Sequence, residues 1–225
     1  MEPRGVGRDE EDVKAYLAAG QARSLAPLPP PPERRGSFHC FRGQKMSIDE
    51  LTLSELAEHH PGLTRPIATC FAEAASVCFD RHHSPPCELS LDHAGEKTLM
   101  ALGWKVPSGK IRNAWANDID TTESGACGVC LAVVHRAIGL VAVRRAETRK
   151  GADYYLAPIG ANVDDLENCI RLEVSGVDRG DATVITRRLA AKVKQTRDAK
   201  TNLPALAVVC GFKERLVLLS APIPP

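Results

Sequence analysis

Residues 121–220 carry an ordered alternation of helix and strand patterns, and this order constrains the fold more than any other feature of the chain. The segment 121–138 is apolar on nearly all sides, which is typical of a buried helix. Strand patterns follow at 140–145, 152–156 and 169–174, a second helix pattern runs from Asp181 to about Arg197, and a strand pair spans 205–209 and 215–220. The order predicts an α/β (α+β) fold: a helix, a three-stranded antiparallel core, a second helix and further strands.

The chain divides by composition into three parts. Residues 1–45 include the proline-rich run LAPLPPPPERRGS, so we expect a disordered tail there. Residues 46–118 are expected to form a mainly helical N-terminal segment, with an amphipathic helix at 67–79 behind Thr64 and Pro66, a short strand at 87–92, and further helix over 96–119. Residues 119–225 then hold the α/β core.

The charge totals favour no class of partner. The chain has 29 Lys and Arg against 28 Asp and Glu, so no global field indicates nucleic acid or a membrane surface. Residues 144–215 are mildly basic, with 14 Lys and Arg against 10 Asp and Glu. No apolar run reaches membrane-spanning length, and the eight cysteines lie in helix and strand patterns more than in a disulfide framework. We therefore expect a cytoplasmic protein with no membrane partner.

Three acids and a lysine stand on or beside the predicted elements of the core. Glu123 opens the apolar helix, Asp153 begins a strand in GADYYL, and Glu173 lies in the strand RLEVSG. Acids on adjacent strands can hold a hard divalent cation such as Mg²⁺. Lys192, in RRLAAKVKQ, falls on the apolar stripe of its helix, where its ammonium must reach solvent or meet an acid.

This element order with these acids resembles the core of the restriction-endonuclease-like, or PD-(D/E)XK, nuclease superfamily over about residues 120–220. The resemblance implies that Asp153 and Glu173, joined by Glu123, bind Mg²⁺ as a cofactor. It also implies a lysine two residues after the glutamate, where this chain has Ser175. Some members supply the lysine from the following helix, and Lys192 fits that role; Lys150 is a weaker candidate.

The resemblance implies a metal-dependent phosphodiester hydrolase acting on DNA or RNA, with Asp153, Glu173 and Lys192 as catalytic residues. Substrate contacts are expected from Gln195, Arg149, Arg187 and Arg188, with Arg144 as a further phosphate contact. Two alternatives stay open: a catalytically inactive scaffold of the same fold that binds protein or nucleic acid, and an unrelated soluble α/β domain.

Structural roles compete with these functional interpretations. Asp120 and Glu123 have the spacing of a helix capping box, and Asp153 and Glu173 suit a strand start and an exposed strand face. The pair Cys127 and Cys130 is better explained by core packing than by metal binding. The series formed by Cys78, His82, His83 and Cys87 has zinc-like spacing, although Cys78 belongs to a helix stripe.

Overall fold

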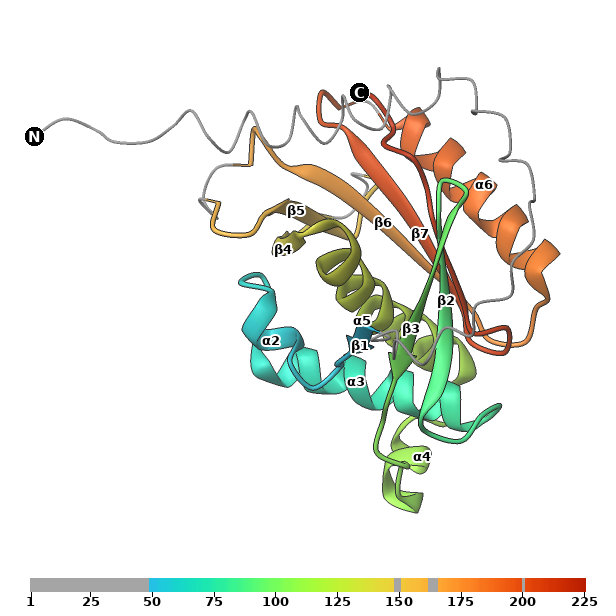
Figure 1. The fold of residues 1–225 in the computed structure, drawn as a ribbon. Coiled ribbons are helices and arrows are strands. Elements are labelled where there is room, and N and C mark those ends of the chain that lie inside the picture. The colour runs from blue at the N-terminus through green and yellow to red at the C-terminus, as the bar shows by residue number, and fades with distance from the viewer. Residues whose placement is uncertain (1–48, 148–150, 162–165, 200) are drawn as a thin grey trace, which may run out of the picture.

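A computed structural model describes residues 49–147, 151–161, 166–199 and 201–225, so the expected tail at 1–45 lies outside the described residues. The chain forms a mixed α/β fold around one eight-stranded sheet, which confirms the predicted fold class (Figure 1). The strand order across the sheet is β1-β3-β2-β8-β7-β6-β5-β4. The strands from the two halves of the chain therefore meet inside a single sheet.

The C-terminal half follows the predicted order. The helix α5 (Asp118–Ile138) leads into the antiparallel strands β4 (Leu140–Arg145), β5 (Tyr154–Pro158) and β6 (Ile170–Val177). The helix α6 (Ala182–Asp198) then returns the chain to β7 (Ala205–Gly211), which pairs parallel with β6, and β8 (Leu216–Leu219) completes a hairpin with β7. A helix crossover between β6 and β7 is the expected way to join two parallel strands.

The N-terminal half holds more strand than the sequence patterns indicate. Its elements are β1 (Asp49–Leu51), α2 (Leu56–His59), α3 (Arg65–Asp80), β2 (Cys87–His93), β3 (Glu96–Leu102) and α4 (Gly109–Ala114). The short strand expected at 87–92 is confirmed as β2. The helix expected over 96–119 is wrong at its start, because residues 96–102 form β3 and pair antiparallel with β2.

A two-residue turn explains that error. Ala94 and Gly95 both have positive φ, at 52° and 96°, and His93 pairs directly with Glu96. Two successive left-handed residues make the turn whose twist matches a β-hairpin. Gly95 N–H also donates to the Asp92 carboxylate at 2.8 Å. The turn chemistry therefore overrides the helix-forming character of the sequence EKTLMAL.

The two faces of the sheet have different covers. On one face, α3 packs against α5, and their contact is close because Gly125 and Gly128 of α5 lie against the backbone of Ala75 and Phe71. The alternate strand residues Leu172 and Val174 point into this main core. On the opposite face α6 lies across β6 and β7, as Figure 1 shows. None of the helices in the described part of the chain is long and apolar enough to span a membrane.

The N-terminal ends of the two long core helices test the capping predictions. Asp181 caps α6 as predicted, and its side chain accepts a hydrogen bond from Val184 N–H at 2.9 Å. The capping box expected for Asp120 and Glu123 is wrong, because α5 begins earlier and its cap is Asn117. The Asn117 side chain accepts from Ile119 N–H at 3.0 Å. Asparagine satisfies free N–H groups at a helix start as well as aspartate does.

Candidate functional site

Glu173 occupies the centre of the candidate site, on the middle of β6. Its neighbours Leu172 and Val174 point into the α5 core, so the glutamate side chain points to the face covered by α6. Only 5 % of the residue is exposed. The alternative of a solvated strand residue is therefore wrong: Glu173 is a buried acid that requires polar partners.

Two side chains from α6 supply those partners. Lys192 Nζ donates to Glu173 Oε1 at 2.6 Å, and Gln195 Nε2 donates to the same oxygen at 3.0 Å. Lys192 Nζ also lies 3.4 Å from Gln195 Oε1. Of the two outcomes expected for a lysine on the sheet-facing stripe, reaching solvent or meeting an acid, Lys192 therefore shows the second. The three side chains form a hydrogen-bonded triad between sheet and helix, which we call the Glu173 triad.

Asp153 lies one residue before β5, and β5 is the strand next to β6. Its backbone N–H donates to Leu172 O at 2.7 Å, and its carboxylate Oδ2 accepts from Val174 N–H at 2.7 Å. The side chain thus takes the place of a strand carbonyl beside Glu173 and continues the ladder by one residue. The strand predicted from residue 152 begins at Tyr154, so Asp153 lies one residue outside β5 and beside Glu173 of β6. One oxygen of each carboxylate already accepts a hydrogen bond.

The surroundings of Glu173 raise the pKa of its carboxyl group. Burial raises the pKa of the Glu173 carboxyl above its usual value, the hydrogen bond from Lys192 acts in the opposite direction, and the Asp153 charge raises the pKa again. The negative charge of Asp153 therefore makes ionisation of Glu173 less favourable. A bound cation would reduce this repulsion.

Arg171, which the sequence analysis did not single out, lies two residues before Glu173 on the same strand face. It is 2 % exposed, and its guanidinium donates to the carbonyls of Leu203, Gly151 and Thr196 at 3.3, 3.5 and 3.4 Å. Thr196 belongs to the last turns of α6, where a cation is favoured. Strand parity with Glu173 was the available signal: a charged residue at both 171 and 173 marks a polar strip beneath the helix.

Glu123 is exposed in the second turn of α5, one turn before Cys127. The Cys127 thiol senses all three predicted acids: burial raises its pKa to about 12, Asp153 adds the next largest contribution, and Glu123 and Glu173 act in the same direction. Within residues 49–147, 151–161, 166–199 and 201–225, no three His, Cys, Asp or Glu side chains are grouped so as to hold a metal ion.

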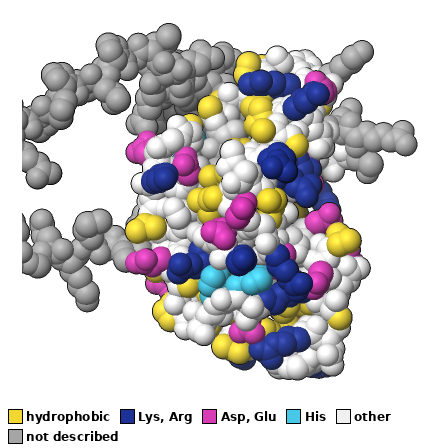
Figure 2. All heavy atoms as spheres, turned by 90° about the vertical axis from the view of Figure 1, so that its right-hand side faces the viewer, with side chains coloured by type: hydrophobic (Ala, Val, Ile, Leu, Met, Phe, Trp, Pro, Cys, Tyr) yellow, Lys and Arg dark blue, Asp and Glu magenta, His cyan; other side chains and the backbone are white. Residues whose placement is uncertain are grey.

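Of the predicted substrate contacts, Gln195 belongs to the triad itself. Arg187 and Arg188 are exposed on α6, and Arg144 is exposed near the end of β4. Arg149 and Lys150 lie outside the described residues. Figure 2 shows Lys and Arg side chains spread over the face seen from the right of Figure 1, with Asp and Glu among them. This face has no continuous basic surface, in agreement with the even charge balance of the chain.

An open hollow of about 520 Å³ adjoins the triad. It is lined by Gly151, Ala191, Lys194, Gln195, Asp198 and Ala199. Because Gln195 belongs both to this hollow and to the triad, solvent reaches the second hydrogen-bond partner of Glu173. A larger hollow of about 630 Å³ lies elsewhere, between β1, one side of α3 and Trp104, and contains none of the predicted site residues.

The zinc-like series around the end of α3 has structural partners. The Cys78 thiol is buried and donates to Thr121 O at 3.5 Å. His82 Nε2 lies 3.0 Å from Asp178 Oδ1, and His83 Nε2 lies 3.0 Å from Phe212 O. These contacts tie the end of α3 to the segments that follow β6 and β7.

The role of Asp153 as a ladder acceptor leads to a stability prediction. Asp153→Ala is expected to lower the free energy of unfolding by about 1–3 kcal/mol, because it leaves the Val174 N–H without an acceptor. Asp153→Asn retains a side-chain oxygen and should lose less than half as much. Urea denaturation at pH 7 measures both values. Equal losses for the two variants would contradict the ladder role.

No protein-family model, no curated protein and no solved structure matches this chain.

Proposed function

We propose that this chain is a metal-dependent phosphodiester hydrolase of the nuclease-like kind, acting on DNA or RNA. One observation carries the proposal. An acid at the start of β5, an acid in the middle of β6 and a lysine from α6 occupy one region, in the element order expected of that class of fold. This set combines ligands for a hard cation with a donor for water or phosphate.

The donor set fits Mg²⁺. This ion usually keeps several waters and is bound through one or two carboxylates together with substrate phosphates, so two acids are sufficient. Asp153 uses Oδ2 for Val174, and Glu173 uses Oε1 for Lys192 and Gln195, so each carboxylate has a second oxygen with which to bind an ion. When bound, Mg²⁺ would stabilise the negative charge that develops on the phosphate during hydrolysis.

The chain's own residues would then divide the remaining work. The Lys192 ammonium, already directed at Glu173, would orient the attacking water by donating a hydrogen bond. Gln195 lies at the border of the open hollow and would hold Lys192 or a phosphate oxygen. Arg187 and Arg188 would contact the phosphate backbone from the exposed side of α6.

Cleavage assays with conservative variants test this proposal. Single- and double-stranded DNA and RNA are incubated with Mg²⁺ or Mn²⁺, and the products are resolved on gels. Asp153→Asn and Glu173→Gln should each lower the cleavage rate by at least about 100-fold, which corresponds to about 3 kcal/mol of transition-state stabilisation. Both variants keep a hydrogen-bonding side chain, so circular dichroism and thermal unfolding must show a retained fold.

Lys194→Ala is the matched control for Lys192→Ala, because Lys194 is exposed two residues further along the same helix. Loss of cleavage in Lys192→Ala with activity retained in Lys194→Ala would support the assigned role. The proposed nuclease activity would be refuted by wild-type cleavage rates in the Asp153 and Glu173 variants. It would also be refuted if the wild-type protein cleaved none of the four substrates.

The catalytically silent scaffold is the second candidate, and the closure of the Glu173 triad favours it. Lys192 and Gln195 together occupy one oxygen of a side chain that is almost fully buried. In a scaffold the triad would fasten α6 to the sheet. Calorimetry separates the two candidates: heat from Mg²⁺ or Mn²⁺ binding that disappears in Asp153→Asn supports the enzyme, and its absence from the wild-type protein supports the scaffold.

We also propose a cytoplasmic location. The free thiols of the described ranges include the buried side chains of Cys78, Cys130 and Cys210. Free buried thiols persist where the environment is reducing. Fluorescence microscopy of the tagged full chain would test the proposal.

A further inference from the structure

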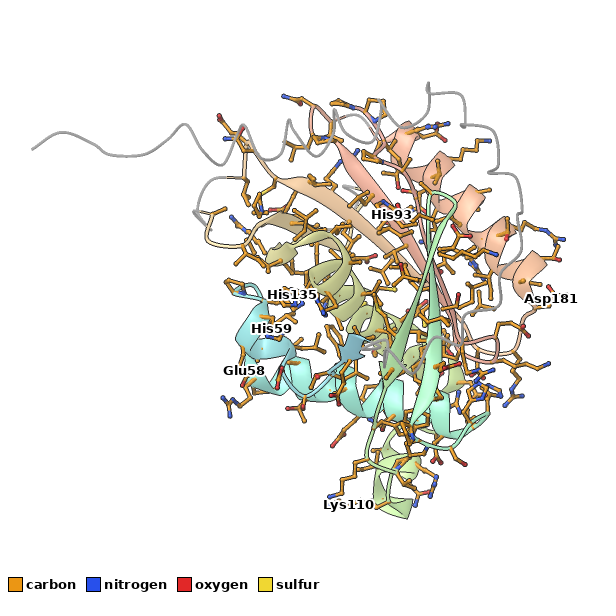
Figure 3. All side chains as sticks on the ribbon, in the orientation of Figure 1. Glu58, His59, His93, Lys110, His135 and Asp181 are labelled. Carbon is orange, nitrogen blue, oxygen red and sulfur yellow. The ribbon has the colours of Figure 1, made fainter. Side chains whose placement is uncertain are left out.

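Three histidines gather where α2 meets the end of α5. The His59 ring stacks on the His135 ring with centroids 4.2 Å apart, and the His60 ring meets His135 edge-on at 5.8 Å. Figure 3 labels His59 and His135, whose side chains lie together between these two helices. His135 is in the last turn of α5, which passes through Gly139 directly into β4. The cluster therefore lies beside an edge strand of the sheet.

His60 is the buried member of this cluster, and it binds that edge strand. Its Nδ1 accepts a hydrogen bond from Ala142 N–H at 2.9 Å, and Gly62 N–H donates to Ala142 O at 2.8 Å. Both backbone groups on the outer side of Ala142 are thus satisfied by residues 60–62, which we call the His60–Gly62 clip. Among the strands of the described residues, β4 pairs only with β5, so the clip covers the free edge of this sheet.

Gly62 fits the clip tightly against β4. A Cβ atom at this position would lie 2.6 Å from the Val143 carbonyl carbon and 2.7 Å from the Arg144 nitrogen. The neighbouring strand is irregular, with a register shift between Ala142 and Arg144. Residues 60–62 therefore pair with β4 at its bulge, where the regular ladder is interrupted.

The hydrogen bond to Ala142 requires a neutral His60 ring. Because Nδ1 accepts a hydrogen bond from the Ala142 N–H, the neutral ring carries its own proton on Nε2. That nitrogen is buried and has no hydrogen bond of good geometry with the described residues, although the nearby Leu131 carbonyl favours protonation slightly. Protonation at Nδ1 would place two N–H groups face to face. The clip and the imidazolium are thus incompatible.

We propose that the His60–Gly62 clip is an acid-sensitive latch, which releases the edge of β4 when His60 is protonated. The charged and titratable groups around His60 influence its protonation. His59 and His135 oppose a charge on His60, Arg136 follows His135 on α5, and Glu55 lies 3.9 Å from the His59 ring. Protonation of His59 and His135 makes a positive charge on the buried His60 ring less favourable. Opening of the clip exposes His60 to water, where the charged ring is solvated.

The size of the effect follows from the ring's titration. Burial lowers the pKa of His60 from 6.5 to about 4, with His135 and His59 adding to the shift. A folded-state pKa below the unfolded value gives stability that is complete above pH 6.5 and is lost as the pH falls through 4. The difference of about 2.5 units shifts the opening equilibrium by up to about 300-fold over that window.

Amide hydrogen exchange of the full chain measures the latch directly. The amides of Ala142 and Gly62 are held by the clip, and Val208 on the interior strand β7 reports global opening. After correction for intrinsic exchange, protection at Ala142 and Gly62 should fall steeply between pH 7 and pH 4, by about 100-fold. Protection at Val208 should stay above that at Ala142 throughout.

Two variants test whether protonation of His60 causes the loss of amide protection. His60→Asn offers a carbonyl oxygen to Ala142 without a titrating ring, so the steep fall should disappear. His135→Gln removes a positive neighbour and brings the pKa of the closed His60 ring closer to 6.5, so the fall in protection should be smaller while the clip stays closed at pH 7. Unchanged protection at Ala142 from pH 7 to pH 4 would overturn the proposal, as would a fall of unaltered size in His135→Gln. The readout is independent of phosphodiesterase activity, so the two proposals can fail separately.

Discussion

Lys192→Ala is expected to lower the free energy of unfolding by about 3 kcal/mol at pH 7, because it leaves the Glu173 carboxylate buried without its ammonium partner. The Glu173 side chain is 6 % exposed and that of Lys192 is 20 % exposed, so water replaces the lost partner only in part. Urea denaturation at constant ionic strength provides the measurement. Lys194→Ala, on the exposed side of the same helix, should change the value by less than about 0.5 kcal/mol.

The loss of unfolding free energy caused by Lys192→Ala should depend on pH. The pKa of Glu173 is already raised above 4.5 by burial, and removing the lysine raises it further. An acid whose pKa is raised in the folded state contributes stability that is complete below its unfolded-state pKa. This stability is lost as the pH rises through the folded-state pKa. The variant should therefore approach wild-type stability near pH 4 and lose most at neutral pH. A deficit that is the same at pH 4 and pH 7 would contradict a buried charge as its cause.

Replacing both partners gives the complementary result. Glu173→Leu combined with Lys192→Met removes the two charges and fills the space with apolar atoms, so the double variant should be more stable than Lys192→Ala and close to the wild-type protein. Gln195 then loses an acceptor but lies beside the open hollow, where water can replace it. A double variant as unstable as Lys192→Ala would show that the lost contacts are not electrostatic.

Asp178→Ala is expected to lower the free energy of unfolding by about 2–4 kcal/mol. Asp178 Oδ2 accepts from Arg81 at 3.3 Å, and its Oδ1 lies 3.0 Å from His82 Nε2, with all three side chains less than one-fifth exposed. The contact from Arg179 adds little because that side chain is 69 % exposed. Thermal and chemical unfolding supply the value.

Asp178→Asn separates charge from shape at this position. The amide keeps one oxygen for His82 or Arg81 but removes the negative charge, so about half of the loss should remain. Glu88→Ala, an exposed acid on β2, is the control and should have no measurable effect. An unfolding free energy for Asp178→Ala within about 0.5 kcal/mol of wild type would mean that the network is not stabilising.

Periodicity predicted which faces of the strand and the helix Glu173 and Lys192 occupy. Alternation along β6 placed Glu173 opposite Leu172 and Val174, and the helical stripe of α6 directed Lys192 at the sheet. Both patterns depend on local geometry, which the sequence expresses directly. The hydrogen bond between Asp153 and Val174 could not be predicted, because it requires the register of β5 against β6. Register is a tertiary property.

Strand ends were harder to predict than strand existence. The sequence Ser175-Gly176 suggested the end of a strand, yet β6 continues to Val177. A Cβ atom on Gly176 would lie 2.6 Å from Thr122 O, so the glycine permits α5 to cross the strand closely. Glycine inside a strand can mark such an approach instead of a turn. The contact partner lies more than fifty residues earlier, and no local pattern reveals it.

The position of β8 has a consequence for biosynthesis. β8 lies between β7 and β2, with Ser90 paired to Leu216, so the β2–β3 hairpin joins the C-terminal strands only through it. A ribosome makes the hairpin long before it makes β8. During translation the hairpin must therefore wait with β1 as its paired strand, and a chain interrupted before residue 216 would leave an unfinished edge on each side of the missing strand. Such nascent chains should depend on chaperones until β8 emerges.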